Sequence, residues 1–296
     1  MGSSENPETR LLLATLQKGC EDLGWIQGRN AQTEIRWAGG DLAVMRTQAA
    51  ELVAWRPEVV VTQATPATLA FRESTRNIAN VFVAVADPVG AGIAESISHP
   101  GGNSTGFVNF EPTIGGKWLE LLREVAPKIE HVAILLNPKT YPGGLGGVQV
   151  RFAQSAAPAF HMTAVETPFF TAADIESTLA ALARDPAAGL LVMPDTSTLV
   201  HSALIVELAR RYRIVAVYPY GYYPRGGGLL SYGTNLSDLY RQAAGYVDRI
   251  LRGEKPGDLP IQSPTKYELV INLKTAKELG IDVPPTLLAR ADEVIE

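Results

Sequence analysis

The sequence is poor in the residues that build covalent cross-links and metal centres. Its 296 residues include one cysteine and four histidines. A single cysteine excludes an intrachain disulfide and the Cys/His spacing of a zinc site. The histidines are scattered and have no acidic partners close by in the sequence, namely His99, His131, His161 and His201. We therefore predict that the protein holds no metal and no cofactor.

Long apolar runs and catalytic signature motifs are also missing. No apolar stretch is long enough to cross a bilayer. The sequence contains no Gly-x-Ser-x-Gly elbow, P-loop or His-Glu-x-x-His stretch, and the glycines of 143–147 lack the spacing of a dinucleotide-binding loop. Cys20 falls within an amphipathic helix pattern, where a packed thiol is expected rather than a nucleophile. An α/β enzyme is therefore the least favoured class.

The charged residues form no basic stripe. Lys and Arg number 26 against 31 Asp and Glu, which gives a net charge of −5. This balance argues against a nucleic-acid partner. With 46% hydrophobic and 19% charged residues, the chain has ample apolar surface for folded cores, and its length suits two compact domains.

A short β-branched run, a small-residue turn and an amphipathic helix recur along the chain. Asn6-Pro7 begins the first helix as N-cap and first helical residue, and a second helix is predicted over 41–55. Strands are predicted at 32–36, 59–62, 81–85, 104–110, 131–136, 163–167, 189–193, 215–218 and 229–232.

Alternating strands and helices indicate an α/β fold with parallel sheets, in which ligands bind beyond the carboxyl ends of the strands. The two series predict two Rossmann-like lobes joined by a hinge of several strands. We assign residues 1–108 with 230–256 to the N-terminal lobe and 109–229 with 257–296 to the C-terminal lobe.

Polar residues at predicted strand ends are the first candidates for a binding site. Thr65-Pro66 begins a helix directly after the 59–62 strand, where free N–H groups favour an anion such as a carboxylate. Thr65 either caps that helix or contacts a ligand. Asp87 and Asp195 follow strands at equivalent places in the two predicted series. Each either accepts a hydrogen bond from a ligand ammonium or hydroxyl, or caps its own following segment.

Tyrosines cluster late in the chain. Such rings can cover an apolar or planar ligand while their hydroxyls remain hydrogen-bonded. Some of them are instead expected to be core or surface residues. The group consists of Tyr218, Tyr220, Tyr222, Tyr223 and Tyr232, with Tyr141 earlier.

The order of short motifs resembles the ABC-transporter substrate-binding family of the type I periplasmic-binding-protein fold, in the branch with tryptophan-binding-like lipoproteins. The motifs are LGW at 23–25, GRN at 28–30, RWAGGD at 36–41, ATPA at 64–67, DPVG at 87–90, PGGNSTG at 100–106, GKWLELL at 116–122, YP at 218–219 and NLKTAK at 272–277.

The resemblance implies a monomeric two-lobed binder, periplasmic or anchored to the membrane outside the cytoplasm, which closes its cleft on a small molecule and delivers it to an ABC permease. By position, the ligand-binding residues of the family correspond to Ser3, Ser4, Thr65, Pro66, Asp87, Asn109, Tyr141, Asp195 and Tyr220.

One departure from the family concerns the first strand, which in this fold is central in its sheet. Here it is reduced to the few residues before Asn6, and no export signal is visible. We expect the given sequence to be truncated at its N-terminus, by a misassigned start codon, although Met1-Gly2-Ser3-Ser4 also fits a vector remnant.

The favoured function is therefore solute capture for an importer, with an amino acid or related small carboxylate as ligand. The alternative is a ligand-sensing module that acts on a signalling or regulatory partner, because the same fold serves that purpose.

Overall fold

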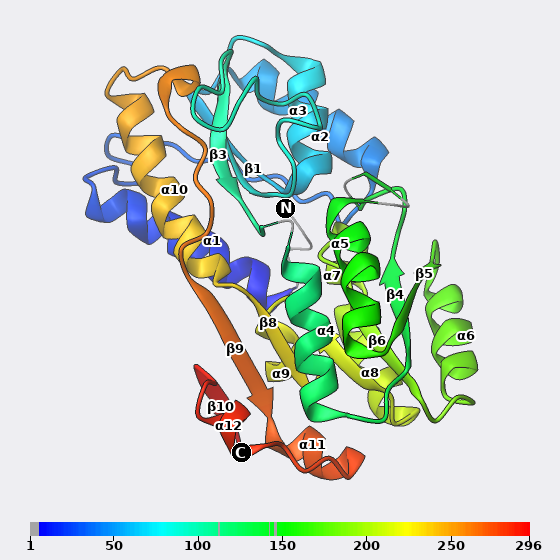
Figure 1. Ribbon diagram of the computed structural model, residues 1–296. Coiled ribbons are helices and arrows are strands. Elements are labelled where there is room, and N and C mark those ends of the chain that lie inside the picture. The colour runs from blue at the N-terminus through cyan, green and yellow to red at the C-terminus, as the bar shows by residue number, and fades with distance from the viewer. Residues whose placement is uncertain (1–5, 112, 142, 145–146) are drawn as a thin grey trace. The chain divides into compact units, whose positions relative to one another are not determined.

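The computed structural model describes residues 6–111, 113–141, 143–144 and 147–296 (Figure 1). The chain forms two compact units, each built from two separate pieces. The first unit is Met1–Phe110 with Leu236–Thr265, and the second is Glu111–Asn235 with Lys266–Glu296. The chain therefore passes from one unit to the other three times, after residues 110, 235 and 265.

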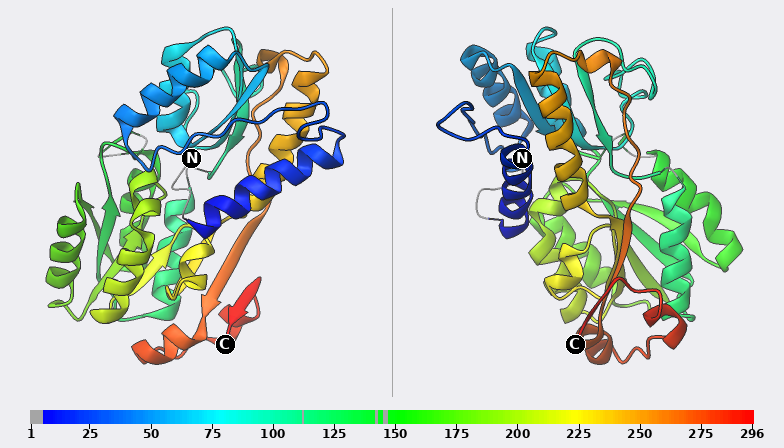
Figure 2. Two further views of the ribbon diagram at one scale, coloured as in Figure 1. Left: turned by 180° about the vertical axis from the view of Figure 1, so that it is seen from behind. Right: turned by 90° about the vertical axis from the view of Figure 1, so that its left-hand side faces the viewer.

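The first unit has a three-stranded parallel sheet in the order β1-β2-β3, formed by β1 (Val59–Gln63), β2 (Ala79–Val85) and β3 (Ser104–Val108). One face is covered by α2 (Leu42–Trp55) and α3 (Ala64–Ser74), and the other by α10 (Leu236–Leu251). Helix α1 (Pro7–Asp22) lies alongside α10 (Figures 1 and 2).

Side-chain caps explain where the first two helices begin. The Asn6 carboxamide oxygen accepts hydrogen bonds from the N–H groups of Glu8 and Thr9, and Asp41 does the same for Ala43 and Val44. These contacts satisfy N–H groups that a helix leaves open at its start. Both helix starts agree with the sequence prediction.

The prediction of a strand at residues 32–36 is wrong. These residues form no regular secondary structure, although their alternating pattern is typical of a strand. A strand forms only where a neighbouring strand takes up its hydrogen bonds. The edge strand β1 pairs only with β2 among the described residues, so residues 32–36 do not extend the sheet.

The second unit has a seven-stranded sheet in the order β10-β9-β8-β7-β6-β4-β5. Its strands are β4 (His131–Leu136), β5 (Thr163–Pro168), β6 (Ala188–Val192), β7 (Val215–Tyr218), β8 (Leu230–Thr234), β9 (Tyr267–Asn272) and β10 (Glu293–Ile295). All neighbours are parallel except β8 and β9. The predicted α/β class with mainly parallel sheets is thus confirmed.

Helices cover both faces of this sheet (Figure 1). On one face lie α4 (Ile114–Val125) and α5 (Val148–Ala156), which continues as a 3-10 turn, Ala157–Phe160. On the other lie α6 (Ala172–Leu182) and α8 (Ser202–Arg211). The shorter helices are α7 (Thr196–Val200), α9 (Tyr222–Arg225), α11 (Leu273–Leu279) and α12 (Pro285–Leu288), and a 3-10 turn, Pro256–Asp258, lies in the first unit.

The units meet after residues 110, 235 and 265, whereas the predicted domains met after residues 108, 229 and 256. Strand β8 pairs with β7 and β9, so it belongs to the second unit, whereas the prediction placed 230–256 in the first. Gln262 pairs with Phe107 beside β3, so 257–265 belongs to the first unit. The first of these two differences reflects β9, an antiparallel partner of β8 that the sequence analysis did not predict.

Candidate functional site

The carboxyl end of β1 holds the most unusual backbone of the first unit. Ala64, the first residue of α3, has a left-handed conformation with φ of 66°. Ala84 near the end of β2 also has a positive φ, 59°, where the pairing with β3 shifts register. A left-handed non-glycine residue costs about 1–2 kcal/mol. Such strain is concentrated at functional sites, and both residues lie at the same edge of the sheet.

Thr65 follows Ala64 and is 5% exposed. Its hydroxyl oxygen is buried and has no hydrogen-bond partner among the described residues. Gln63, the residue before α3, makes no side-chain cap for this helix, in contrast to Asn6, which caps α1. Thr65 therefore does not cap the helix, which was the alternative interpretation, and an unsatisfied hydroxyl lies beside an uncapped helix start.

The other candidates of the first unit differ in burial. Pro66 is half-buried and Asp87 is exposed, and Asp87 accepts a hydrogen bond of 2.8 Å from the N–H of Gly90, which stabilises its own turn. Asn109 is 3% exposed, and its N–H donates to the carbonyl of Val85 at 3.2 Å. Asp87 and Asn109 thus follow neighbouring strands. Ser3 and Ser4 lie outside the described residues.

Asp195 is the central polar residue of the second unit. Its Oδ1 accepts hydrogen bonds from the N–H groups of Ser197 and Thr198, which caps α7, and from the Thr140 hydroxyl at 3.1 Å. Its Oδ2 accepts a hydrogen bond from the N–H of Asn137 at 3.2 Å. Asp195 therefore joins the loop after β4 to the start of α7.

The burial of Asp195 changes its acidity. Its side chain is 8% exposed. Burial raises the pKa of Asp195 to about 6, against the opposing effect of hydrogen bonds from Thr198, Asn137, Thr140 and Ser197 that stabilise the carboxylate. At neutral pH the group is thus largely ionised and can attract an ammonium group.

Thr196 begins α7 and was missed in the sequence analysis. It is 8% exposed, and its hydroxyl oxygen is buried without a partner among the described residues. The parallel order β1-β2-β3 matches β6-β7-β8, so Thr65 after β1 corresponds to Thr196 after β6. Asp87 follows β2, which corresponds to β7, whereas Asp195 follows β6. The two acids therefore do not occupy equivalent places, and that prediction is wrong.

Tyr141 is another buried candidate of the second unit. It is 3% exposed, and its hydroxyl donates a hydrogen bond of 2.5 Å to Oε1 of Gln149 on α5. Burial is the main factor that raises the Tyr141 pKa, and the charge of Asp195 raises it further. Nε2 of Gln149 is buried without a partner among the described residues, so a second free donor lies at this edge.

The predicted tyrosine cluster is a continuous stack. Tyr218 and Tyr223 are stacked at 4.7 Å between centroids, Tyr223 and Tyr222 at 4.5 Å, and Tyr222 and Tyr220 at 5.7 Å. Tyr218 and Tyr223 are 1% exposed and belong to the core, whereas Tyr220, at the end of the stack, is 9% exposed. Tyr232 stacks instead on Tyr267. Tyr222 and Tyr220 thus form the less buried end of the stack.

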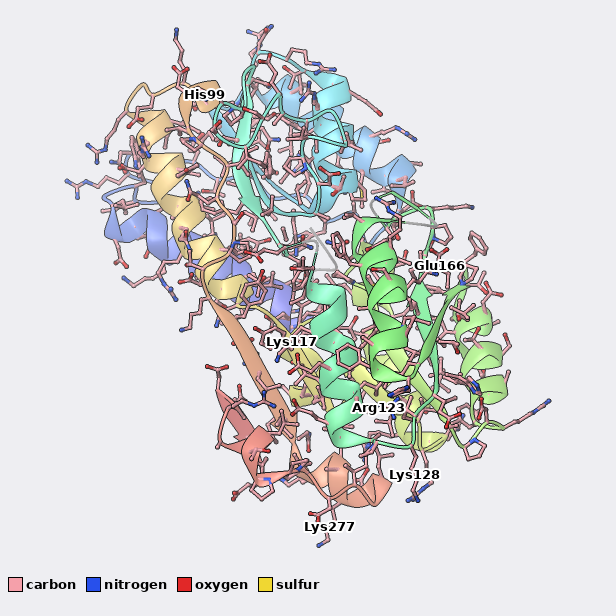
Figure 3. All side chains as sticks on the ribbon, viewed as in Figure 1. His99, Lys117, Arg123, Lys128, Glu166 and Lys277 are labelled. Atoms are coloured by element: carbon pink, nitrogen blue, oxygen red, sulfur yellow. The ribbon has the colours of Figure 1, made fainter. Side chains whose placement is uncertain are left out.

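The groups at these strand ends are hydroxyls, amides and carboxylates. Figure 3 shows Lys128, just before β4, and Lys277, on α11, at the other end of the second sheet. Among the described residues, no group of three or more His, Cys, Asp or Glu is arranged to hold a metal ion. In the same part of the chain no helix combines the length and apolar character needed to cross a membrane.

The model of the ABC transporter substrate binding protein family matches residues 5–295. The chain belongs to this family. The resemblance identified from the motifs is therefore confirmed, and the family is one of solute-binding rather than catalytic proteins.

Known proteins resemble the chain over most of its length. A tyrosine-binding protein of Clostridioides difficile is 25% identical over 265 residues, which make up 89% of this chain and 75% of that protein. A conserved domain protein of Vibrio cholerae has a TM-score of 0.88 and 28% identity, with 98% of this chain and 96% of that chain covered. An ABC domain from Streptococcus pneumonia in complex with L-Trp has a TM-score of 0.90 and 24% identity, with the same coverage.

Proposed function

We propose that this protein captures a free amino acid, or a closely related small carboxylate, outside the cytoplasm and delivers it to the permease of an ABC importer. It acts as a monomer, without a cofactor and without catalysing a reaction. Membership of a solute-binding family supports the capture of a small molecule. The tyrosine-binding relative and the L-Trp complex support an amino acid as the ligand class.

The observation that carries the proposal is the matched pair Thr65 and Thr196. Each hydroxyl is buried, has no partner among the described residues and lies in the first turn of the helix that follows corresponding strands. A buried polar atom without a partner costs about 1–3 kcal/mol. A bound ligand that pairs with these hydroxyls recovers that free energy.

Each unit carries groups whose chemistry suits a different part of an amino acid. The uncapped start of α3 offers N–H groups and the Thr65 hydroxyl to a carboxylate. In the second unit, the Asp195 carboxylate suits an ammonium group, because Oδ2 accepts only one hydrogen bond from the described residues. Tyr220 and the Gln149 amide suit the side chain of the ligand.

Native mass spectrometry of the freshly purified protein is the first test, because a retained ligand appears there as a defined mass. Calorimetry with the proteinogenic amino acids, starting with L-tyrosine and L-tryptophan, then measures affinity. We expect Thr65→Val and Thr196→Val each to weaken binding about tenfold, the effect of losing one buried hydrogen bond.

Thr105→Val is the matched control. The Thr105 hydroxyl is also fully buried in the first unit, but it donates to the carbonyl of Leu259 at 2.6 Å. This variant loses stability and keeps its affinity. Equal affinities for all three variants and the parent protein would remove both threonines from the site, and a panel without any binding would reject the ligand class.

A further inference from the structure

A buried polar cluster lies under the first turn of α3. It consists of Thr62 on β1, Asn80 on β2 and Thr68 on α3, which are 7%, 0% and 0% exposed. The Thr62 hydroxyl lies 2.9 Å from the Thr68 hydroxyl and 3.0 Å from Oδ1 of Asn80. The Thr68 hydroxyl donates to the carbonyl of Ala64 at 2.9 Å. Three contacts therefore connect β2 to the first residue of the helix.

The number of protons sets the direction of these hydrogen bonds. Each threonine hydroxyl has a single proton to donate. With the Asn80 carbonyl facing Thr62, two protons are available for three contacts, and Nδ2 of Asn80 has no partner among the described residues. With the amide turned so that nitrogen faces Thr62, three protons serve three contacts. The series of hydrogen bonds then runs from the Asn80 amide to Thr62, from Thr62 to Thr68, and from Thr68 to the carbonyl of Ala64.

This series of hydrogen bonds ends on Ala64, the residue with the strained backbone. Ala64 has a φ of 66°, and Thr65 follows it directly. An alanine leaves the left-handed region readily unless its surroundings hold it there. The hydrogen bond from Thr68 fixes the carbonyl of Ala64, and the chain beneath it fixes the Thr68 hydroxyl. Hydrogen bonds that run in one direction also polarise one another, which stiffens the whole series.

We propose that Thr62, Thr68 and Asn80 are positioning residues for ligand binding. Their hydrogen bonds hold Ala64 in the left-handed conformation, and Ala64 in turn directs the Thr65 hydroxyl and the N–H groups of the α3 start. The part of this inference that concerns affinity rests on the proposed function of Thr65. The part that concerns the backbone of α3 does not.

The test uses hydrogen exchange of the full chain without ligand. Thr62→Val keeps the shape of the side chain and removes its proton, whereas Thr62→Ser keeps the hydroxyl. We expect Thr62→Val to speed exchange in the peptide covering residues 64–71 about tenfold, the effect of one lost buried hydrogen bond. The peptide covering α2 is the internal reference. Thr62→Ser stays at the parent rate, and Thr105→Val, which loses a hydrogen bond far along the sequence from α3, leaves this peptide unchanged.

Ala64→Gly separates positioning from general stability. Glycine adopts a positive φ without strain. With Gly at residue 64 the left-handed conformation no longer depends on the hydrogen bonds beneath it, so their loss should change ligand affinity less. Thr62→Val should therefore weaken binding of the amino acid found by calorimetry about tenfold in the parent protein and about twofold or less in the Ala64→Gly background. A merely structural role gives the same loss in both backgrounds.

Either of two results overturns the proposal. One is an exchange rate of the 64–71 peptide that is the same in Thr62→Val and Thr105→Val. The other is a loss of affinity on Thr62→Val that is the same with Ala and with Gly at residue 64. If Thr62→Val does not fold, Thr68→Val removes the last donor before Ala64 and is judged by the same two results. If no amino acid binds at all, the proposed function fails while the exchange measurement still decides whether the chain supports α3.

Discussion

The Thr140 hydroxyl lies 3.1 Å from Oδ1 of Asp195, so the loop after β4 and the start of α7 share one carboxylate. The same oxygen caps the helix, and Oδ2 accepts a hydrogen bond from the N–H of Asn137. This carboxylate therefore holds together two loops of its own unit, in addition to the ligand contact proposed for it.

Asp195→Ala should lower the free energy of unfolding by about 2–3 kcal/mol, because it removes a helix cap and leaves several buried donors without an acceptor. Asp195→Asn keeps an oxygen for the cap and should lose less. Thr171→Ala, which breaks the exposed capping box of α6, is the control with an expected loss of about 1 kcal/mol. Urea denaturation measures all three, and an Asp195→Ala protein as stable as its parent would contradict the structural role.

The raised pKa of Asp195 predicts a pH dependence of stability. In the folded protein this pKa is about 6, whereas the ordinary value is 3.8, so between these values the folded state binds more protons than the unfolded state. The contribution of Asp195 to the free energy of unfolding therefore falls as pH rises from 4 to 6, by on the order of 2–3 kcal/mol.

Denaturation curves of the parent protein and Asp195→Asn at pH 4, 5, 6 and 7 measure this contribution, because other carboxylates cancel in the difference. The difference in unfolding free energy should shift in favour of the Asn variant as pH rises to 6 and remain constant above it. A difference that does not change with pH would mean that Asp195 titrates normally.

Gly19 and Gly245 form a matched pair of helical glycines in the first unit. A Cβ added at Gly19 on α1 would lie 2.7 Å from Cβ of Ala244 on α10, whereas one added at Gly245 meets no atom within 4 Å. Gly19→Ala should therefore lower the free energy of unfolding by about 1–3 kcal/mol through overpacking. Gly245→Ala should raise it by about 1 kcal/mol, because alanine favours a helix. Thermal denaturation distinguishes the two, and stabilisation by both variants would argue against close packing of α1 on α10.

The thiol of Cys20 should be unreactive in the folded protein. Burial, assisted by the nearby charge of Asp248, raises its pKa to about 11, so little thiolate exists at pH 8. We expect a disulfide reagent to label it at least about tenfold more slowly than a free cysteine. Labelling in urea should restore the ordinary rate, and rapid labelling without urea would show that the first helix opens.

The sequence predicted the parts of the fold that depend on local pattern. Helix starts at Asn6 and Asp41 carry their own caps, and the buried runs of β1, β4 and β6 are apolar enough to be recognised. Strand pairing depends on residues far apart in the sequence. Local pattern therefore could not show that residues 32–36 form no strand or that β9 runs antiparallel to β8.

The same limit applies to the candidate site. Thr65, Asn109, Tyr141, Asp195 and Tyr220 were predicted from strand ends and family position, and the structure places them at the carboxyl edges of the two sheets. Whether they bind a ligand stays a prediction. Thr196 was available to the reasoning that found Thr65, since it too begins a helix after a strand. Gln149 was not, because only its contact with Tyr141 brings it to this edge.

Each unit is assembled from two separate stretches of chain, and this has a consequence for anyone who wishes to study one of them alone. No single stop codon or new start yields either unit whole. A gene for the first must splice residue 110 to residue 236, and one for the second must splice 235 to 266. A protease that nicks the chain after residue 110 likewise releases no intact unit, because α1 remains packed on α10, which belongs to the other fragment.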